Sequence, residues 1–147
     1  MSNQPFVIER VLDAPVTRVW NALTKNEQMK NWYFQLADFK PVVGFEFSFT
    51  GQADEHTEYT HLCTVTEVVP GKKLSYSWRY EGYPGYSVVS FELSEEGNKT
   101  RLKLTHEGIE SFAAGGKDFR KENFAEGWAH ILDKSLKGFL ETEAVNA

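Results

Sequence analysis

The chain of 147 residues predicts an α+β fold, in which an antiparallel sheet carries helices on one face. Three observations lead to this fold class. Segments with strand-like alternation follow one another with only short turns between them. Helical periodicity is confined to the two ends of the chain. Because helices do not alternate with strands, a parallel α/β sheet is not expected.

The N-terminal part predicts one strand and two short helices. Phe6 to Leu12 is rich in β-branched residues and predicts the first strand. Pro15 suits the first turn of a helix, and the apolar residues after it, at 16, 19, 20 and 23, share one helical face. Asn26 predicts the cap of a second short helix that runs through Trp32.

The middle of the chain predicts a series of antiparallel strands joined by short turns. Strands are expected at 45–50, 59–69, 74–79, 89–93 and 101–106, with turns at 70–72, 82–85 and 96–99. The first of these strands alternates Phe45, Phe47 and Phe49 with polar residues, which gives it one aromatic face.

A long amphipathic helix is predicted near the C-terminus, after a loop from Gly108 to Lys117 and a possible cap at Asp118. Its apolar stripe consists of Phe124, Trp128, Ile131, Leu132, Leu136, Phe139 and Leu140. This pattern predicts an amphipathic α-helix of about 20 residues, roughly 30 Å long, which is enough to cross a small domain.

Composition excludes several classes of protein. One cysteine, Cys63, makes neither an internal disulfide nor a multi-cysteine zinc site. The net charge of −5 argues against non-specific nucleic-acid binding. No apolar run reaches the roughly 18 residues of a spanning helix, so no membrane insertion is expected. The N-terminus does not resemble a signal peptide. We therefore expect a single domain over residues 1–147, located in the cytoplasm.

Several motifs, taken together in order, resemble a known family. They lie at 12–16, 19–24, 32, 65–78, 100–108 and 127–128. The chain resembles the family related to the C-terminal domain of the activator of the heat-shock protein 90 ATPase. That family belongs to the START-like (SRPBCC) helix-grip superfamily, which also contains polyketide cyclases and Bet v allergens. Two positions depart from the family pattern, namely Lys25-Asn26 after Thr24, and Cys63 where glycine is common.

The resemblance implies a curved antiparallel sheet that grips the C-terminal helix, often with an apolar cavity between them. Aromatic residues make up 14% of the chain, so the inward face can either line a pocket or fill a core. We predict a hydrophobic ligand-binding site with no cofactor, no metal and no catalytic residue. Its predicted residues are Trp32, Phe47, His61, Tyr76, Trp78, Phe91, Leu104, His106, Phe124 and Trp128.

Titratable side chains leave alternatives open. His106 shares the inward face with Leu104, so it either orients a ligand or forms ordinary hydrogen bonds at a strand end. His61 and Cys63 share a strand face, but a nucleophilic pair needs closer contact and a third group. A triplet at 126, 130 and 133 suits a solvated helix face better than a metal site. The basic cluster at 117, 120 and 121 suits a solvated helix start, with an anionic ligand head or a partner surface as the alternative.

The expected function is therefore non-enzymatic binding of a small apolar ligand, as a carrier or a sensor. An interaction module acting on a chaperone or client protein is the first alternative, and it follows from the resemblance alone. A polyketide cyclase-like enzyme is the second alternative. It would need His106, Glu67 and the tyrosines to converge inside a cavity.

Overall fold

A computed structural model describes residues 5–29, 32, 39–52, 58–83, 85–109, 111–112 and 121–140 of the chain. Among these residues, six strands form one antiparallel sheet in the order β1-β6-β5-β4-β3-β2. The elements are β1 Phe6–Leu12, α1 Val16–Thr24, α2 Asn26–Met29, β2 Glu46–Gln52, β3 Glu58–Val69, β4 Lys73–Tyr80, β5 Ser87–Glu96, β6 Lys99–Glu107, α3 Lys121–His130 and the π-helical segment η3 Ile131–Leu136.

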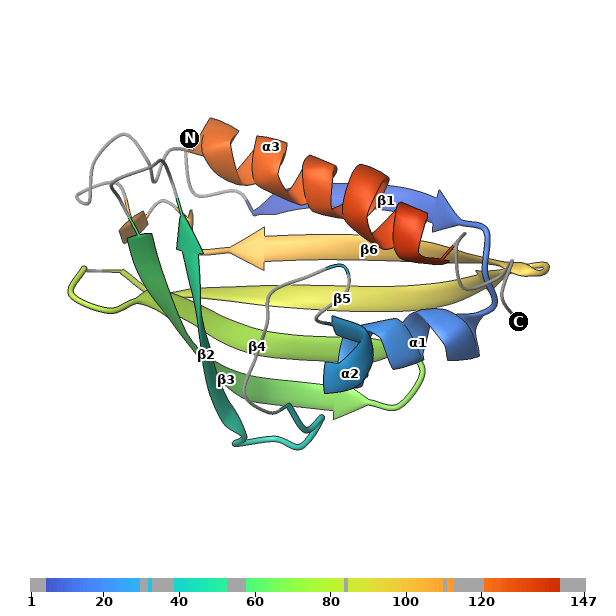
Figure 1. Cartoon of the computed structure of the whole chain (residues 1–147), viewed down its shortest axis with the longest axis horizontal. Helices are drawn as coiled ribbons and strands as arrows, with labels where there is room; N and C mark the ends of the chain where they lie inside the picture. Colours follow the sequence, from blue (N-terminus) through green and yellow to red (C-terminus); the bar gives the residue numbers. More distant parts are fainter. Residues whose placement is uncertain are drawn as a thin grey trace.

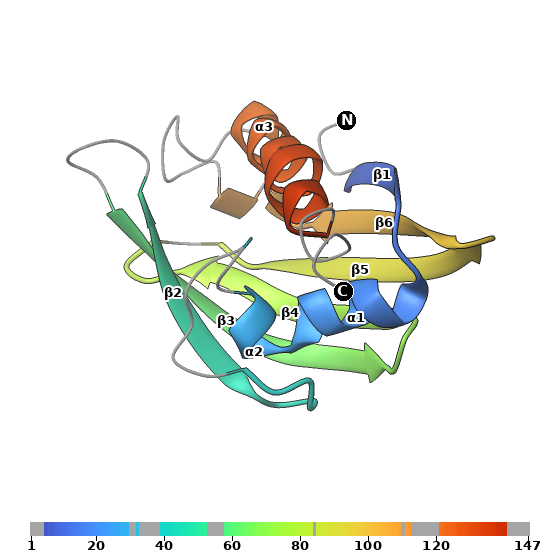
Figure 2. The same cartoon turned by 45° about the vertical axis from the view of Figure 1, so that its right-hand side comes forward.

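The sheet is an antiparallel meander to which the N-terminal strand adds one edge. Strands β2 to β6 pair with their neighbours in sequence, and β1 pairs with β6 from Phe6↔His106 to Leu12↔Thr100. The helices all lie on the same side of the sheet (Figure 1), and the sheet curves around them (Figure 2). The predicted fold class is confirmed, and the architecture is that of a helix-grip fold.

Strand alternation divides the sheet into an inner and an outer face. Along β6, Leu102, Leu104 and His106 are buried, whereas Lys103 between them is exposed. The core lies between this inner face and the helices, as expected for a sheet with one solvated face. The described part of the chain contains no helix long and apolar enough to cross a membrane.

The long strand β3 bends near its middle. Its pairing with β4 shifts register between Val65 and Glu67. Just before the shift, the amide of Thr64 donates to the Ser77 hydroxyl at 3.0 Å. A bulge bends the strand that carries it and increases the local twist. This irregularity therefore helps the sheet to curve towards the helices.

The C-terminal helix differs from the prediction, because Ile131–Leu136 is π-helical rather than α-helical. The amide of Lys137 bonds back to the carbonyl of Leu132, five residues earlier. The physical reason lies in the buried stripe, which repeats every four residues: Phe124, Trp128, Leu132, Leu136 and Leu140. A four-residue step in an α-helix drifts by about 40°, hence by about 160° over this stripe. A wider π turn cancels part of that drift and keeps all five side chains against the sheet.

Two further predictions at the ends of elements are corrected or untested. Helix α2 ends at Met29, and Trp32 lies in a turn. The Trp32 amide bonds to the Met29 carbonyl three residues earlier, which tightens the chain out of the helix. The predicted cap at Asp118 and most of the loop from Gly108 to Lys117 lie outside the described residues. So do Lys117, Arg120 and the side chain of Lys121.

Candidate functional site

Eight of the ten predicted site residues form one connected network of ring contacts inside the molecule. Ring centroids 4.8–6.0 Å apart join Phe47, His61, Tyr76, Trp78, Phe91, His106, Phe124 and Trp128. The rings come from β2 to β6 on one side and from α3 on the other. Most of these contacts are edge-to-face or tilted, the arrangements that aromatic pairs prefer.

Trp78 and Trp128 connect the sheet to the helix at the centre of this network. Their rings lie 5.5 Å apart, and each also contacts His106. Both tryptophans are buried, and both indole N–H groups are satisfied: Trp78 donates to the Tyr80 hydroxyl at 2.9 Å and Trp128 to His106 Nδ1 at 3.1 Å. The network is thus apolar with a few polar atoms that are already paired.

His106 is fully buried, and its hydrogen bonds define its tautomer. Because an indole N–H only donates, Nδ1 of His106 accepts from Trp128. The Ser87 hydroxyl donates to the Trp78 carbonyl at 2.7 Å, so Nε2–H of His106 donates to Ser87 Oγ at 2.9 Å. Burial lowers the pKa of His106 to about 3. The imidazole is therefore neutral at physiological pH, with both nitrogens engaged.

His61 and Cys63 lie on the inner face of β3 but do not resemble an activated pair. The His61 ring stacks on Phe49 with centroids 4.4 Å apart, and Nδ1 faces the Phe49 carbonyl at 3.3 Å. Burial lowers the pKa of His61 to about 4, despite backbone hydrogen bonds that raise it. Burial also raises the pKa of the Cys63 thiol. A protonated, buried thiol is a poor nucleophile.

The other two predicted site residues are buried in different surroundings. Trp32 donates its indole N–H to the Ala22 carbonyl at 2.9 Å, which fastens it against α1. Leu104 lies in the centre of β6, opposite Phe91 on β5 and Ile8 on β1. Both side chains belong to the same hydrophobic core as the ring network.

Sequence reasoning missed three rings that extend the network. Phe49 shares the predicted aromatic face with Phe47 but is not among the predicted site residues, although it contacts both His61 and Trp78. Tyr80 continues the alternation of Tyr76 and Trp78, so the strand pattern could have found it. Phe112 lies outside any strand or long helix, and no periodic signal marks it.

The remaining charged candidates lie outside the interior. Glu67 is on the outer face, where Lys73 Nζ approaches its carboxylate at 3.1 Å. It therefore does not converge with His106. Glu126, His130 and Asp133 are exposed on the helix, and Asp133 accepts two hydrogen bonds from the Arg10 guanidinium. Within the described ranges, no three His, Cys, Asp or Glu side chains gather in a way that could hold a metal ion.

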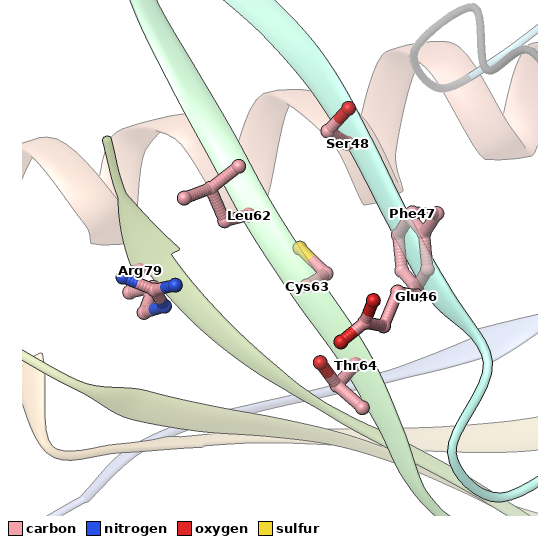
Figure 3. A pocket seen from close by; sticks show the side chains of 7 residues that line it. All are labelled: Glu46, Phe47, Ser48, Leu62, Cys63, Thr64 and Arg79. Atoms are coloured by element: carbon pink, nitrogen blue, oxygen red, sulfur yellow. The ribbon is translucent and has the colours of Figure 1, made fainter.

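Two pockets lined by described residues open on the outside of the molecule. One, of about 300 Å³, spans β2, β3 and β4 and is lined by Glu46, Phe47, Ser48, Leu62, Cys63, Thr64 and Arg79 (Figure 3). Strand pairing places Glu46, Ser48, Leu62, Thr64 and Arg79 on the outer face. The other, of about 430 Å³, lies between the start of α1 and the β3–β4 turn, with Val16 and Lys72 in its lining.

A curved sheet around a long C-terminal helix, with a ring-lined interior, defines a helix-grip protein. The family model described as Activator of Hsp90 ATPase homolog 1-like protein matches residues 13–141. The chain therefore belongs to this family, as its motifs predicted. No curated protein matches the sequence.

Solved structures share the fold over almost the whole chain. Protein MLL2253 from Mesorhizobium loti is 28% identical with a TM-score of 0.74, and the alignment covers 95% of this chain and 98% of that one. CV1439 from Chromobacterium violaceum is 24% identical with a TM-score of 0.80, covering 96% and 99%. DynU16, from the dynemicin biosynthetic locus, is 20% identical with a TM-score of 0.76, covering 95% of this chain and 48% of that one.

Proposed function

We propose that the protein is a non-enzymatic carrier or sensor of a small hydrophobic ligand, which it binds between the sheet and the C-terminal helix. The observation that carries the proposal is the wall of inward rings on β2 to β5 that faces Phe124 and Trp128. Ligand sites of this type are mostly apolar, with few polar groups. Among the described residues, the polar groups beside these rings include the Tyr80 hydroxyl and the imidazoles of His61 and His106.

The state of the titratable groups favours binding over catalysis. A general acid or base works best with a pKa near the operating pH. Burial instead lowers the pKa of His61 to about 4 and that of His106 to about 3, and it raises the pKa of Tyr80. These groups are suited to hydrogen bonding in one fixed protonation state.

Native mass spectrometry of the purified protein, compared with its denatured mass, tests the proposal. We expect an excess mass that disappears on denaturation, and its value identifies the ligand class. Phe47→Leu should lower the occupancy, because it removes one ring of the wall. The control Val43→Leu alters an exposed side chain and should not. A bare protein mass, together with no binding of the probe N-phenyl-1-naphthylamine, contradicts the proposal.

A second candidate is a module that associates with a chaperone or its client, and the family description is the observation that favours it. Affinity capture with the chaperone of the same organism tests this candidate. Binding at micromolar concentration supports it, and no association at that concentration removes it. A polyketide cyclase-like activity draws support from the fold shared with DynU16. That activity needs a pair of titratable groups in contact with substrate, and Glu67 does not supply one.

A further inference from the structure

Phe112 closes one end of the ring network from a short loop. It follows β6 in a single helical turn that includes residues 109 and 111–112, and its side chain is only 1% exposed. The ring meets Tyr80 of β4 edge-to-face at 5.1 Å and stacks parallel to Phe124 of α3 at 6.0 Å. Phe112 thus fills the gap between the end of β4 and the start of the C-terminal helix.

The surroundings of Phe112 are shaped for a flat ring. Gly85, in the loop between β4 and β5, has φ +116° and lies directly against this ring. A Cβ at position 85 would lie 2.8 Å from Phe112 Cε1, a distance that real Cβ atoms do not show. The space that the Phe112 ring fills is therefore bounded by the backbone of Gly85 and by the rings of Tyr80 and Phe124. A branched aliphatic group would fill it less well.

An exposed serine holds this loop in place. The Tyr86 amide donates to Ser111 Oγ at 2.8 Å, and the same hydroxyl lies 2.6 Å from the Gly108 carbonyl and 2.9 Å from the Tyr86 carbonyl. A single hydrogen bond of this kind contributes modestly to stability, because water replaces it when the loop opens. Exposed hydrogen bonds of this kind break in local openings of a structure more readily than buried ones.

We propose that Phe112 is a displaceable plug, and that the ligand enters here and places a flat aromatic ring where the Phe112 side chain lies. This proposal rests on the proposed function and adds an entry point and a ligand class to it. In the closed state the Phe112 ring occupies the subsite between Gly85, Tyr80 and Phe124. The ligand then binds only the fraction of molecules in which the plug is out.

Association kinetics of N-phenyl-1-naphthylamine, a flat aryl probe, test the plug by stopped-flow fluorescence. Phe112→Ala should raise the apparent affinity about tenfold or more, because a competent state populated at 10% or less becomes the main state. Ser111→Ala loosens the loop without altering the core and should raise the association rate about three- to tenfold, as expected for one hydrogen bond. Phe139→Ala is the matched control, since Phe139 packs against the core near the far end of the helix.

The outcomes separate the plug from the proposed function. Faster or tighter binding by Phe112→Ala and Ser111→Ala, but not by Phe139→Ala, supports the plug. Equal binding by the original protein and all three variants overturns the plug and leaves the carrier function in place. Equal gains in Phe112→Ala and Phe139→Ala, without a change in Ser111→Ala, also overturn it. No binding by any of the four proteins overturns both proposals. If Phe112→Ala does not fold, Ser111→Ala decides the test against Ser94→Ala, an exposed serine on β5.

Discussion

Two hydrogen bonds, to Ser87 and to Trp128, determine the chemical role of His106. The strand alternation predicted that His106 faces inward, and it does. Its partners were not predictable, because Ser87 and Trp128 are 19 and 22 residues away in sequence. Hydrogen-bond geometry of this kind depends on how three elements pack. From the sequence alone, His106 could orient a ligand or take part in catalysis. In the structure its neutral imidazole on β6 is hydrogen-bonded to Ser87 of β5 and to Trp128 of α3.

Ser87→Ala should destabilise the protein by about 1–3 kcal/mol, because the buried N–H of His106 loses its acceptor. Urea denaturation monitored by tryptophan fluorescence measures this loss. Ser94→Ala, on the exposed face of the same strand, should change the free energy of unfolding by about 0.5 kcal/mol at most. Equal effects of the two substitutions would show that the His106–Ser87 bond contributes nothing.

The two buried histidines should make the protein less stable in mild acid. Their pKa values are about 4 for His61 and about 3 for His106 in the folded state, against 6.5 for an unperturbed imidazole. Below pH 6.5 the unfolded chain therefore binds more protons than the folded chain. The free energy of unfolding falls as the pH decreases towards 4, by at most roughly 1.4 kcal/mol per pH unit for each histidine.

Thermal unfolding between pH 7 and pH 4.5 checks this dependence. His61→Phe keeps a ring stacked on Phe49 and removes one of the two titrations, so it should flatten the curve. Ser94→Ala, at an exposed position of β5 that carries no titratable group, is the control and should leave the slope unchanged. A melting temperature that stays constant from pH 7 to pH 5 in the original protein contradicts the assignment of neutral, buried imidazoles.

At the scale of elements, the C-terminal helix shows that apolar periodicity predicts a helix but not the type of each helical turn. The sequence pattern predicted an amphipathic helix over the correct residues. It also contained a strict four-residue repeat from Phe124 to Leu140, which a straight α-helix cannot keep on one face. That repeat was a readable signal for a π turn. The extent of α2 and the burial of Phe112 had no comparable signal, because both depend on contacts made by loops.

Deletion of Ser135 should be tolerated. Removing one residue lets the π turn at Ile131–Leu136 become a regular α turn, while Leu136 and Leu140 still face the sheet. Insertion of one alanine after Ser135 is the matched control. It turns these two leucines by about 100° away from the core and should cost several kcal/mol, about as much as truncating buried leucines. Urea denaturation compares the two, and a deletion as costly as the insertion contradicts this account.

At the scale of the whole molecule, the sequence predicted the fold class, the meander and the helices on one face. Antiparallel neighbours and alternating burial follow from local patterns, so the sequence can predict them. Local patterns do not predict how the interior is packed. Whether rings such as Phe47, Tyr76 and Trp128 touch each other or line a space depends on sheet curvature and rotamers. The bend of β3 at Val65, which contributes to that curvature, has no clear sequence signal.

The outer face of the sheet carries a row of alternating charges across five strands. Glu9 pairs in register with Lys103, Lys103 with Glu92, and Glu92 with Lys73, whose amino group contacts Glu67. The signs run negative, positive, negative, positive, negative from β1 to β3. Opposite charges on neighbouring strands stabilise a sheet by a few tenths of a kcal/mol per pair. The row also favours water over an apolar partner on this face.

Lys103→Glu tests this row, because it places a carboxylate between Glu9 and Glu92. We expect a loss of about 1 kcal/mol in the free energy of unfolding at low salt, since two favourable neighbours become two repulsive ones. Near 1 M NaCl the Debye length falls to about 3 Å, so most of the loss should disappear. Lys40→Glu makes the same charge change in the exposed segment before β2 and should cost little at either salt concentration. A loss in Lys103→Glu that persists undiminished at high salt would mean that the lysine stem, and not its charge, stabilises the sheet.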